Sequence, residues 1–250
     1  MDPSFISITY GAGGTTRERT HDLVVDILHQ TTMTPMAHLT CVGHSRLELQ
    51  RILERYRDAG VQNVLALRGD APADLGLGAG DLRHAFELVE LARDVGPFSI
   101  GVAAHPEGHP QSPHRTADRR HLAFKLRLAD FAITQFFFRA EDYLSLVDDL
   151  AAFGVEQPVI PGIMPVTNVA QVERFAALSG AELPVELRDR LHAVADDPVE
   201  VCRVGIGAAT ELCATLLAAG APGLHFYTLN RSTATRQIWA NLGLPLAQAA

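Results

Sequence analysis

Short apolar runs alternate along the chain with longer stretches in which apolar residues recur every three or four positions. The short runs are rich in β-branched and aromatic residues, as strands are, whereas the longer stretches have the period of amphipathic helices. This alternation predicts parallel strands joined by crossover helices. Seven strands are expected, at Phe5–Thr9, Met36–Cys41, Asn63–Leu67, Phe98–Ala104, Phe131–Phe137, Pro158–Ile163 and Leu224–Thr228.

Several of the intervening helices have recognisable ends. Ser45 and Glu48 form an S-x-x-E capping box, and Gly60 is a typical helix terminator. Thr16 is expected to cap an earlier helix, and a longer helical tract extends over Pro198–Ala219. Because no linker, repeat or low-complexity segment interrupts this pattern, residues 1–250 are expected to form a single (β/α) barrel domain.

The number of strands bears on the type of barrel. A closed TIM-type barrel has eight strands, and the predicted strands lack the G-x-G-x-x-G turn of a doubly wound dinucleotide-binding sheet. The chain begins almost directly at the strand Phe5–Thr9. We therefore expect an α/β fold, a TIM-type (β/α)8 barrel whose first β/α element is missing from this chain. An open sheet edge favours pairing with another chain, so a homo-oligomer is an alternative to a monomer.

Composition narrows the class of protein. The 250 residues are 47% hydrophobic and 20% charged, an ordinary globular composition. The net charge of −8, without a clustered basic face, argues against nucleic-acid binding. No stretch is expected to cross a membrane, and no signal segment opens the chain. The three cysteines, which suit a reducing cytoplasmic compartment, have no metal-ligand spacing: Cys41, Cys202 and Cys213.

Polar groups follow the predicted strands at their carboxyl ends, where parallel barrels keep their functional residues. Another group of polar residues, His105, Glu107, His109 and His114, fits no common zinc spacing, so no metal is expected. The candidates after different strands are Thr9-Tyr10-Gly11, His38-Leu39-Thr40, Arg68-Gly69-Asp70, His105-Pro106-Glu107, Gln135 and Tyr227–Arg231.

Six segments, in this order, resemble successive motifs of the methylenetetrahydrofolate reductase family. They are Ile8–Ala12, Ala37–Cys41, Ala66–Asp70, Ile133–Phe138, Ile160–Pro165 and His225–Arg231. The resemblance covers essentially the whole chain with the family's spacing. It implies a flavin enzyme of one-carbon metabolism that uses NAD(P)H to reduce bound FAD. The hydride then passes to 5,10-methylenetetrahydrofolate, giving 5-methyltetrahydrofolate. An unrelated flavin- or phosphate-binding barrel is the alternative, but the last two βα loops lack a Gly-rich phosphate cradle.

The resemblance also implies roles for individual residues. Asp70 is expected beside flavin and pterin, Gln135 in the pocket shared by pterin and nicotinamide, and Phe175 as the stacking aromatic. Flavin contacts are implied at Thr9, His38, Arg68, Gly69, Asp70, Ala104, His105, Asp118, His121, Lys125 and Tyr227. Substrate contacts are implied at Gln135, Phe175 and Tyr227, with Gln171 and Arg231 holding the p-aminobenzoyl-glutamate tail.

From the residues alone, these positions have alternative interpretations. Asp70 is equally typical of a turn or a helix N-cap. A lone phenylalanine on a helical stripe, such as Phe175, is typical of a core residue, and Gln135 of a rim amide bonded to a neighbouring loop. Asp118 and Lys125 would be read as a solvated helix face.

The chain departs from the family pattern at two places. Family members begin with a strand of the type F-E-F-F-P-P, and its glutamate, the proposed general acid, is expected to be missing here. Such an acid increases the reaction rate roughly 10²–10⁴-fold. Near Lys125, His121 and Phe124 replace an asparagine and an arginine, and His105 replaces a tyrosine. FMN or no flavin is therefore an alternative to FAD. Two functional alternatives are a flavin-free NADH-dependent short form and a non-catalytic folate- or flavin-binding protein.

Overall fold

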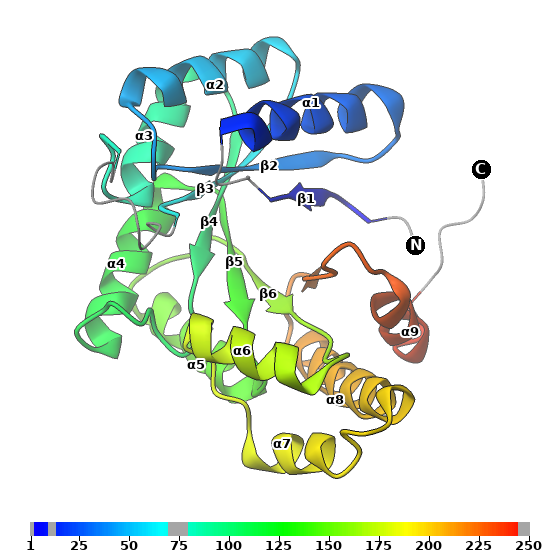
Figure 1. Cartoon of the computed structure of the whole chain (residues 1–250). Coiled ribbons are helices and arrows are strands. Elements are labelled where there is room, and N and C mark those ends of the chain that lie inside the picture. The colour runs from blue at the N-terminus through cyan, green and yellow to red at the C-terminus, as the bar shows by residue number, and fades with distance from the viewer. Residues whose placement is uncertain (1–2, 10–13, 70–79, 245–250) are drawn as a thin grey trace. The chain divides into compact units, whose positions relative to one another are not determined.

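The computed structural model describes residues 3–9, 14–69 and 80–244. In this part of the chain seven parallel strands follow one another in chain order, β1 to β7, with helices between them (Figure 1). This confirms the predicted α/β class and the strand–helix order of a (β/α)8 barrel less one unit. The chain divides into an N-terminal unit, residues 2–103 with 124–131, and a C-terminal unit, residues 104–123 with 132–250. The expectation of a single domain stays a prediction.

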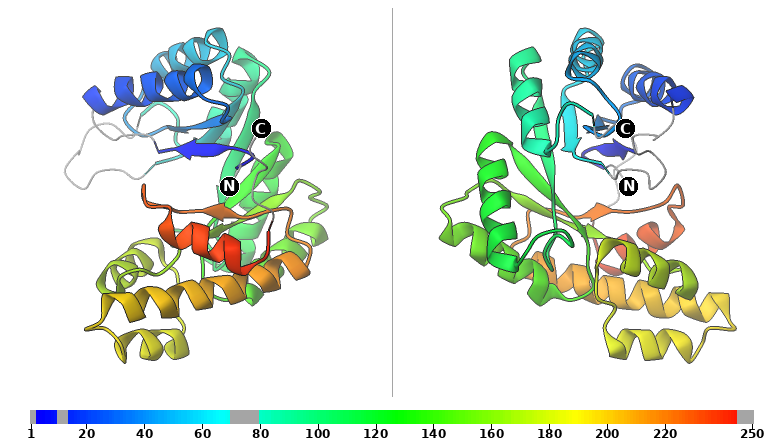
Figure 2. Two further views of the ribbon diagram at one scale, coloured as in Figure 1. Left: turned by 90° about the vertical axis from the view of Figure 1, so that its right-hand side faces the viewer. Right: turned by 60° about the vertical axis from the view of Figure 1, so that its left-hand side comes forward.

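The N-terminal unit contains four strands that pair in parallel, each with its sequence neighbour. Three helices lie on one face of these strands (Figure 2). The strands are β1 (Ile6–Ile8), β2 (Pro35–Thr40), β3 (Asn63–Leu67) and β4 (Ser99–Ala104), and the helices are α1 (Gly14–Gln30), α2 (Arg46–Asp58) and α3 (Ala85–Val95). The capping box of Ser45 and Glu48 is confirmed at the start of α2. The prediction for Thr16 was wrong, because α1 begins two residues earlier.

The N-terminal unit is discontinuous in sequence, and a short later segment completes it. Arg93 of α3 donates to the carbonyl oxygens of Phe98 and Leu128 and pairs with Asp130 at 2.7 Å. The other oxygen of Asp130 accepts from the Ile100 amide at 2.6 Å. Residues 124–131 are therefore part of the hydrogen-bonded framework of β4 and α3.

The C-terminal unit contains the remaining strands and helices. Its strands pair in parallel, β5 with β6 and β6 with β7. They are β5 (Phe131–Phe136), β6 (Val159–Ile163) and β7 (His225–Phe226), with β5 beginning at the unit boundary. The helices are α5 (Ala140–Ala152), α6 (Val169–Ser179), α7 (Val185–His192), α8 (Pro198–Ala218) and α9 (Thr233–Asn241), while α4 (Arg115–Leu128) crosses the boundary.

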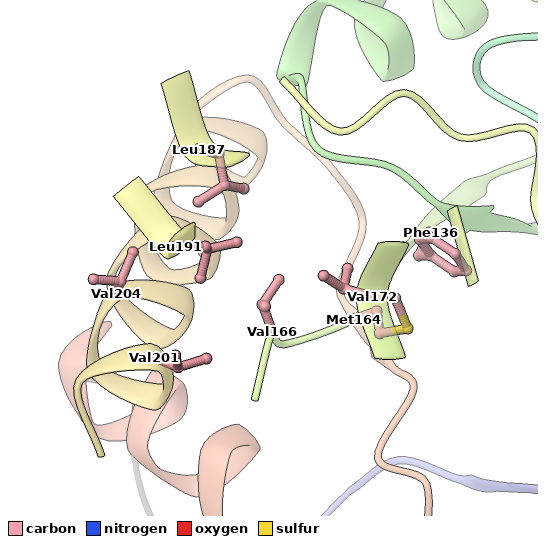
Figure 3. Packing of buried hydrophobic residues seen from close by; sticks show 8 residues of the cluster. All are labelled: Phe136, Met164, Val166, Val172, Leu187, Leu191, Val201 and Val204. Atoms are coloured by element: carbon pink, nitrogen blue, oxygen red, sulfur yellow. The ribbon is translucent and has the colours of Figure 1, made fainter. Parts of the chain in front are cut away.

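One apolar cluster joins β5, the segment after β6, and three helices of this unit. Figure 3 shows the helices α6, α7 and α8 contributing side chains that meet those of the strand and the segment. The members are Phe136, Met164, Val166, Val172, Leu187, Leu191, Val201 and Val204, and Phe175 packs against them. Two helices, α6 and α7, separate β6 from α8 in the sequence, and both contribute residues to this cluster.

The helix α8 is apolar along much of its length. It is long and apolar enough to cross a membrane by length and composition alone, which differs from the expectation that no stretch would be. It contacts β6, α5, α7 and α9, and buries Val201, Val204 and Cys213. In the structure 33% of its apolar 18-residue window is buried, so packing accounts for part of its apolar character. Gly205 lies so close to the segment after β6 that an added Cβ would overlap the carbonyl oxygen of Val166.

Candidate functional site

The described candidate residues divide between the two units. Asp70 lies outside the described residues. The N-terminal unit contains Thr9, His38, Arg68, Gly69 and Lys125. The C-terminal unit contains Ala104, His105, Asp118, His121, Gln135, Gln171, Phe175, Tyr227 and Arg231.

In the N-terminal unit, candidates lie within β2 and directly after β1 and β3. Thr9 directly follows β1 and is exposed, while His38 lies within β2 and is half-buried. Arg68 follows β3, and its carbonyl oxygen accepts from the Val42 amide at 3.0 Å. The next residue, Gly69, has φ +81°, and a Cβ there would lie 2.9 Å from Cβ of Thr40. Glycine is required here both by the backbone angle and by the close approach.

Lys125 does not lie on a solvated helix face. Its side chain is buried, and its Nζ donates to the carbonyl oxygen of Ala103 at 2.6 Å. Asp118, on the same helix, is also buried. Buried charged groups need partners because desolvation is costly. The alternative of a solvated face is therefore wrong for both residues. His121, between them, is exposed.

Arg119 is a buried arginine that the sequence analysis did not single out. Only 1% of its side chain is exposed. Its guanidinium donates to the carbonyl oxygens of His105 (2.9 Å) and Pro106, to Asp118 at 3.0 Å and to Asp149 at 3.2 Å. The helical period contained the signal for its burial, because position 119 shares a face of α4 with two buried leucines, Leu122 and Leu126.

Gln135 lies where the register between β5 and β6 shifts, between Ile133 and Phe136. Its Oε1 accepts from the Phe136 amide at 3.1 Å. The neighbouring Thr134 is fully buried and accepts twice: its Oγ1 from the Gly162 amide at 2.8 Å, and its carbonyl oxygen from the Tyr227 hydroxyl at 2.9 Å. These two bonds tie β5 to β6 and to the residue that follows β7, and they hold the backbone beside Gln135.

Glycine is also required at position 162. An added Cβ would overlap the Thr134 carbonyl oxygen and lie 2.7 Å from the Tyr227 ring. Burial raises the pKa of Tyr227 above the usual tyrosine range, so its phenol remains protonated and donates. The three residues Thr134, Gly162 and Tyr227, here called the strand junction, fix the irregular register from which Gln135 projects.

The turn after β7 has an uncommon backbone conformation. Leu229 and Asn230 have φ angles of 49° and 60°, in the left-handed region. Asparagine tolerates this region, but a leucine there is strained, and such strain is often found at functional sites. The Arg231 amide closes the turn on the Thr228 carbonyl oxygen at 2.8 Å. The turn leaves the Arg231 side chain exposed.

The helix α6 carries two candidates, Gln171 in its first turn and Phe175 one turn later. Asn168 caps the helix by accepting from the Gln171 amide at 2.8 Å. Phe175 is half-buried and packs on the apolar cluster. It is therefore partly a core residue, as expected for a lone phenylalanine on a helical stripe. The guanidinium carbon of Arg174 lies 5.2 Å from the centre of its ring. The ring therefore has both packed and accessible area.

The loop after β4 contacts the connection that follows α6. Ala104, the last residue of β4, is buried, and His105 is half-buried with its ring 4.6 Å from that of His109. Oε1 of Glu107 accepts from the Glu182 amide at 2.7 Å. Pro110 lies under Gly180, where a Cβ would be 2.9 Å from its ring. The loop and the end of α6 are therefore tied together at two points.

Glu107 is a titratable contact in this link. Burial raises the pKa of its carboxyl above the ordinary glutamate value, and repulsion from Asp142 and Glu182 adds to the increase. The hydrogen bond from the Glu182 amide and the charge of Arg139, which pairs with Glu182 at 2.9 Å, oppose the shift without cancelling it. The folded protein therefore binds the proton of this carboxyl more tightly than the unfolded chain does.

Glu107→Gln is expected to stabilise the protein at pH 7, because glutamine keeps the acceptor and removes the charge. A raised pKa means that the folded state binds a proton more tightly than the unfolded state, so wild-type stability falls as pH rises above the ordinary glutamate range. The advantage of the variant should therefore shrink toward pH 4. Urea unfolding at pH 7, 5.5 and 4 measures it. Glu186→Gln, at an exposed position of α7, is the control, and a pH-independent difference would contradict the interpretation.

Comparisons with known proteins match nearly the whole chain to one family. The sequence profile of methylenetetrahydrofolate reductase matches residues 1–243. The 5,10-methylenetetrahydrofolate reductase of Pectobacterium carotovorum subsp. carotovorum is 37% identical over 245 residues, which are 98% of this chain and 81% of that protein. The enzyme of the same name from Escherichia coli (strain K12) is 36% identical over 245 residues, 98% of this chain and 82% of its own.

A solved structure has the same fold. A protein from Clostridium thermocellum that binds two copies of 5-methyl-5,6,7,8-tetrahydrofolic acid aligns with a TM-score of 0.56, covering 93% of this chain and 90% of its own. The two sequences are 13% identical. At that identity the likeness supports the fold alone.

Proposed function

The chain belongs to the methylenetetrahydrofolate reductase family, and on that premise we propose that it reduces 5,10-methylenetetrahydrofolate to 5-methyltetrahydrofolate. The proposed hydride donor is NAD(P)H, and the proposed carrier is a bound flavin, FAD. The observation that supports this proposal is the identity of 36–37% to enzymes of that name over 98% of the chain. The small-molecule partners are then a folate and a nicotinamide dinucleotide.

The polar groups of the N-terminal unit fit a flavin dinucleotide. A bound flavin supplies hydride-transfer chemistry. The guanidinium of Arg68 and the ammonium of Lys125 provide positive charge for a diphosphate, and Thr9 and His38 provide hydrogen-bonding groups. No side chain is accommodated at Gly69. Only backbone atoms are therefore present at this position after β3. In the C-terminal unit the buried Asp118 carboxylate is the proposed acceptor for a hydroxyl or amide of the cofactor.

The C-terminal unit provides the proposed substrate contacts. The Gln135 amide can both donate and accept, as the edge of a pterin or of a nicotinamide amide requires. The accessible part of the Phe175 ring is suited to stacking on a flat heterocycle. Arg231 is exposed on a constrained turn, and its planar fork can bind a glutamate carboxylate with two parallel hydrogen bonds. Gln171 lies one turn before Phe175 on α6 and is the proposed second contact to the folate tail.

The proposal is tested with the purified 250-residue chain, before and after addition of FAD. We expect flavin absorption bands, loss of those bands on anaerobic addition of NADH or NADPH, and their return when 5,10-methylenetetrahydrofolate is added. Formation of 5-methyltetrahydrofolate is followed by chromatography. Turnover without any bound flavin would contradict the cofactor and support the flavin-free short form. Folate binding without turnover would contradict the activity and support a binding protein.

Gln135→Ala is expected to reduce kcat/KM for the folate by roughly 10- to 100-fold, the cost of losing one or two hydrogen bonds to a polar substrate edge. The free energy of unfolding should change little, because the side chain accepts a hydrogen bond from within its own segment, from the Phe136 amide. Steady-state kinetics and urea unfolding measure the two effects. The control is Gln237→Ala, which removes an exposed amide of α9. An unchanged kcat/KM would remove Gln135 from the proposed site.

A further inference from the structure

Arg119 has an unusual environment for a charged side chain. It is 1% exposed, and its guanidinium hydrogen atoms point at four acceptors in the C-terminal unit. Two are carboxylates, of Asp118 and Asp149, and two are the carbonyl oxygens of His105 and Pro106. A buried guanidinium is tolerated only when such acceptors compensate for lost hydration. The planar fork carries five donors on three nitrogens and can reach all four acceptors, whereas an ammonium group has three donors on a single nitrogen.

The acceptors come from three separate elements. His105 and Pro106 begin the loop after β4, Asp118 lies in the first turn of α4, and Asp149 lies near the end of α5. Asp118 also accepts from the Ser112 hydroxyl at 3.2 Å, farther along the same loop. Asp118 and Arg119 therefore hold the loop at its beginning and near its end. The side chain of Asp149 is 40% exposed, so it anchors the guanidinium from the outer side.

The same loop extends this framework to α6. Glu107 accepts from the Glu182 amide, and Pro110 packs under Gly180, both just beyond the helix that carries Phe175. A displacement of the loop would therefore move His105 directly, disturb the hydrogen bond from Ser112 to Asp118 and loosen the end of α6.

We propose that Arg119 is a positioning residue of the flavin site: it holds the loop after β4 and orients the Asp118 carboxylate while compensating its charge. This inference rests on the proposed function, in which His105 and Asp118 contact the flavin. Arg119 itself touches no proposed ligand, because its donors are directed at protein acceptors. The binding of flavin would thus depend on an arginine that acts through the residues it holds in place.

The test compares Arg119→Gln and Arg119→Lys with a matched arginine of the N-terminal unit. Arg93→Gln also removes a guanidinium that donates to two carbonyl oxygens and pairs with a carboxylate, but it lies outside the proposed contacts. Flavin affinity is measured by fluorescence quenching, the geometry of bound flavin by visible circular dichroism, and stability by thermal unfolding. A merely structural role would change the unfolding temperature and leave the spectrum of bound flavin unchanged.

We expect Arg119→Gln to bind flavin roughly 10- to 100-fold more weakly, the range seen when the groups that orient a ligand's contacts are removed, with an altered visible dichroism. Arg119→Lys should not restore affinity, because lysine keeps the charge and loses the fork. Arg93→Gln should bind flavin as the wild type does. If Arg119→Gln does not fold, Asp149→Asn removes the negative charge of one anchor, which also pairs with Arg115 at 3.4 Å. A roughly two- to fivefold loss of flavin affinity is then expected.

Each contrary outcome has one meaning. A wild-type chain that takes up no flavin contradicts the proposed cofactor, and with it the premise of this inference. A wild type that binds flavin, together with Arg119 or Asp149 variants of equal affinity and unchanged dichroism, overturns the role of Arg119 alone. Recovery of affinity in Arg119→Lys would show that charge suffices, and would overturn the positioning role of the fork.

Discussion

Gly205→Ala is expected to lower the free energy of unfolding by about 3 kcal/mol, whereas Gly207→Ala on the same helix is expected to raise it by about 0.5–1 kcal/mol. The two substitutions add the same methyl group two residues apart on α8. At Gly205 the new Cβ would overlap the Val166 carbonyl oxygen and lie 2.8 Å from the Val166 carbonyl carbon and Cβ. At Gly207 no atom of the described residues, apart from the helix backbone and the adjoining residues, lies within 4 Å of the new Cβ.

The opposite signs follow from what the methyl group meets. Backbone atoms cannot move aside as a flexible side chain can, so Gly205→Ala must displace α8 from the segment after β6 and disturb the apolar cluster of Figure 3. Gly207→Ala only reduces the conformational freedom of the unfolded chain and improves helix propensity. Urea unfolding of both variants at pH 7.5 measures the pair. Equal effects of the same sign would show that the close approach at Gly205 is relaxed in solution.

Lowering the pH from 6.5 to 4 is expected to destabilise the wild type by about 3 kcal/mol through His225 alone. Burial of this β7 imidazole lowers its pKa from 6.5 to about 4, because a charged ring would be poorly solvated there. Its ring lies edge-on to that of Tyr227, with centroids 5.2 Å apart. Between the two pKa values the unfolded chain binds a proton that the folded chain does not. Stability is therefore retained above pH 6.5 and lost progressively as the pH falls toward 4.

The contribution of His225 is isolated by comparing His225→Leu with the wild type at each pH, because carboxyl groups titrate in both proteins alike. The variant should lose less stability between pH 6.5 and 4, and the difference between the two curves should approach the value above. His29→Leu makes the same exchange at an exposed position of α1 and is the control. Parallel curves for His225→Leu and the wild type would place a solvated imidazole on β7.

The sequence pattern was sufficient to predict the order of strands and helices, but it did not predict where every element begins and ends. Strands of a parallel sheet are buried on both faces and read as apolar runs, which is why all seven predicted strands correspond to strands among the described residues. The capping box at Ser45 is a local signal and was confirmed. The last strand is only His225–Phe226, because the chain turns into the left-handed residues Leu229 and Asn230 soon afterwards.

Interactions between distant segments could not be predicted from local pattern. The strand junction joins Thr134 to Gly162, 28 residues away, and to Tyr227, 93 residues away. Outside α4, buried Lys125 donates to the Ala103 carbonyl oxygen and buried Asp118 accepts from the Ser112 hydroxyl. Local polarity alone, without these distant partners, suggested a solvated face. The proposed roles of Gln135, Phe175 and Arg231 came from family resemblance rather than from periodicity or charge, and they stay predictions.

The discontinuous N-terminal unit has a consequence for protein dissection. A fragment that stops at Ala103 would leave Arg93 without its Leu128 and Asp130 acceptors and the Ile100 amide without its carboxylate. It would also lack Phe131, whose ring occupies the space where Gly101 has no side chain. Such a fragment therefore ends with exposed donors and a gap beside β4. The missing piece is a short helix end followed by three residues, so a synthetic peptide of residues 124–131 is the natural complement with which to reconstitute this half of the chain.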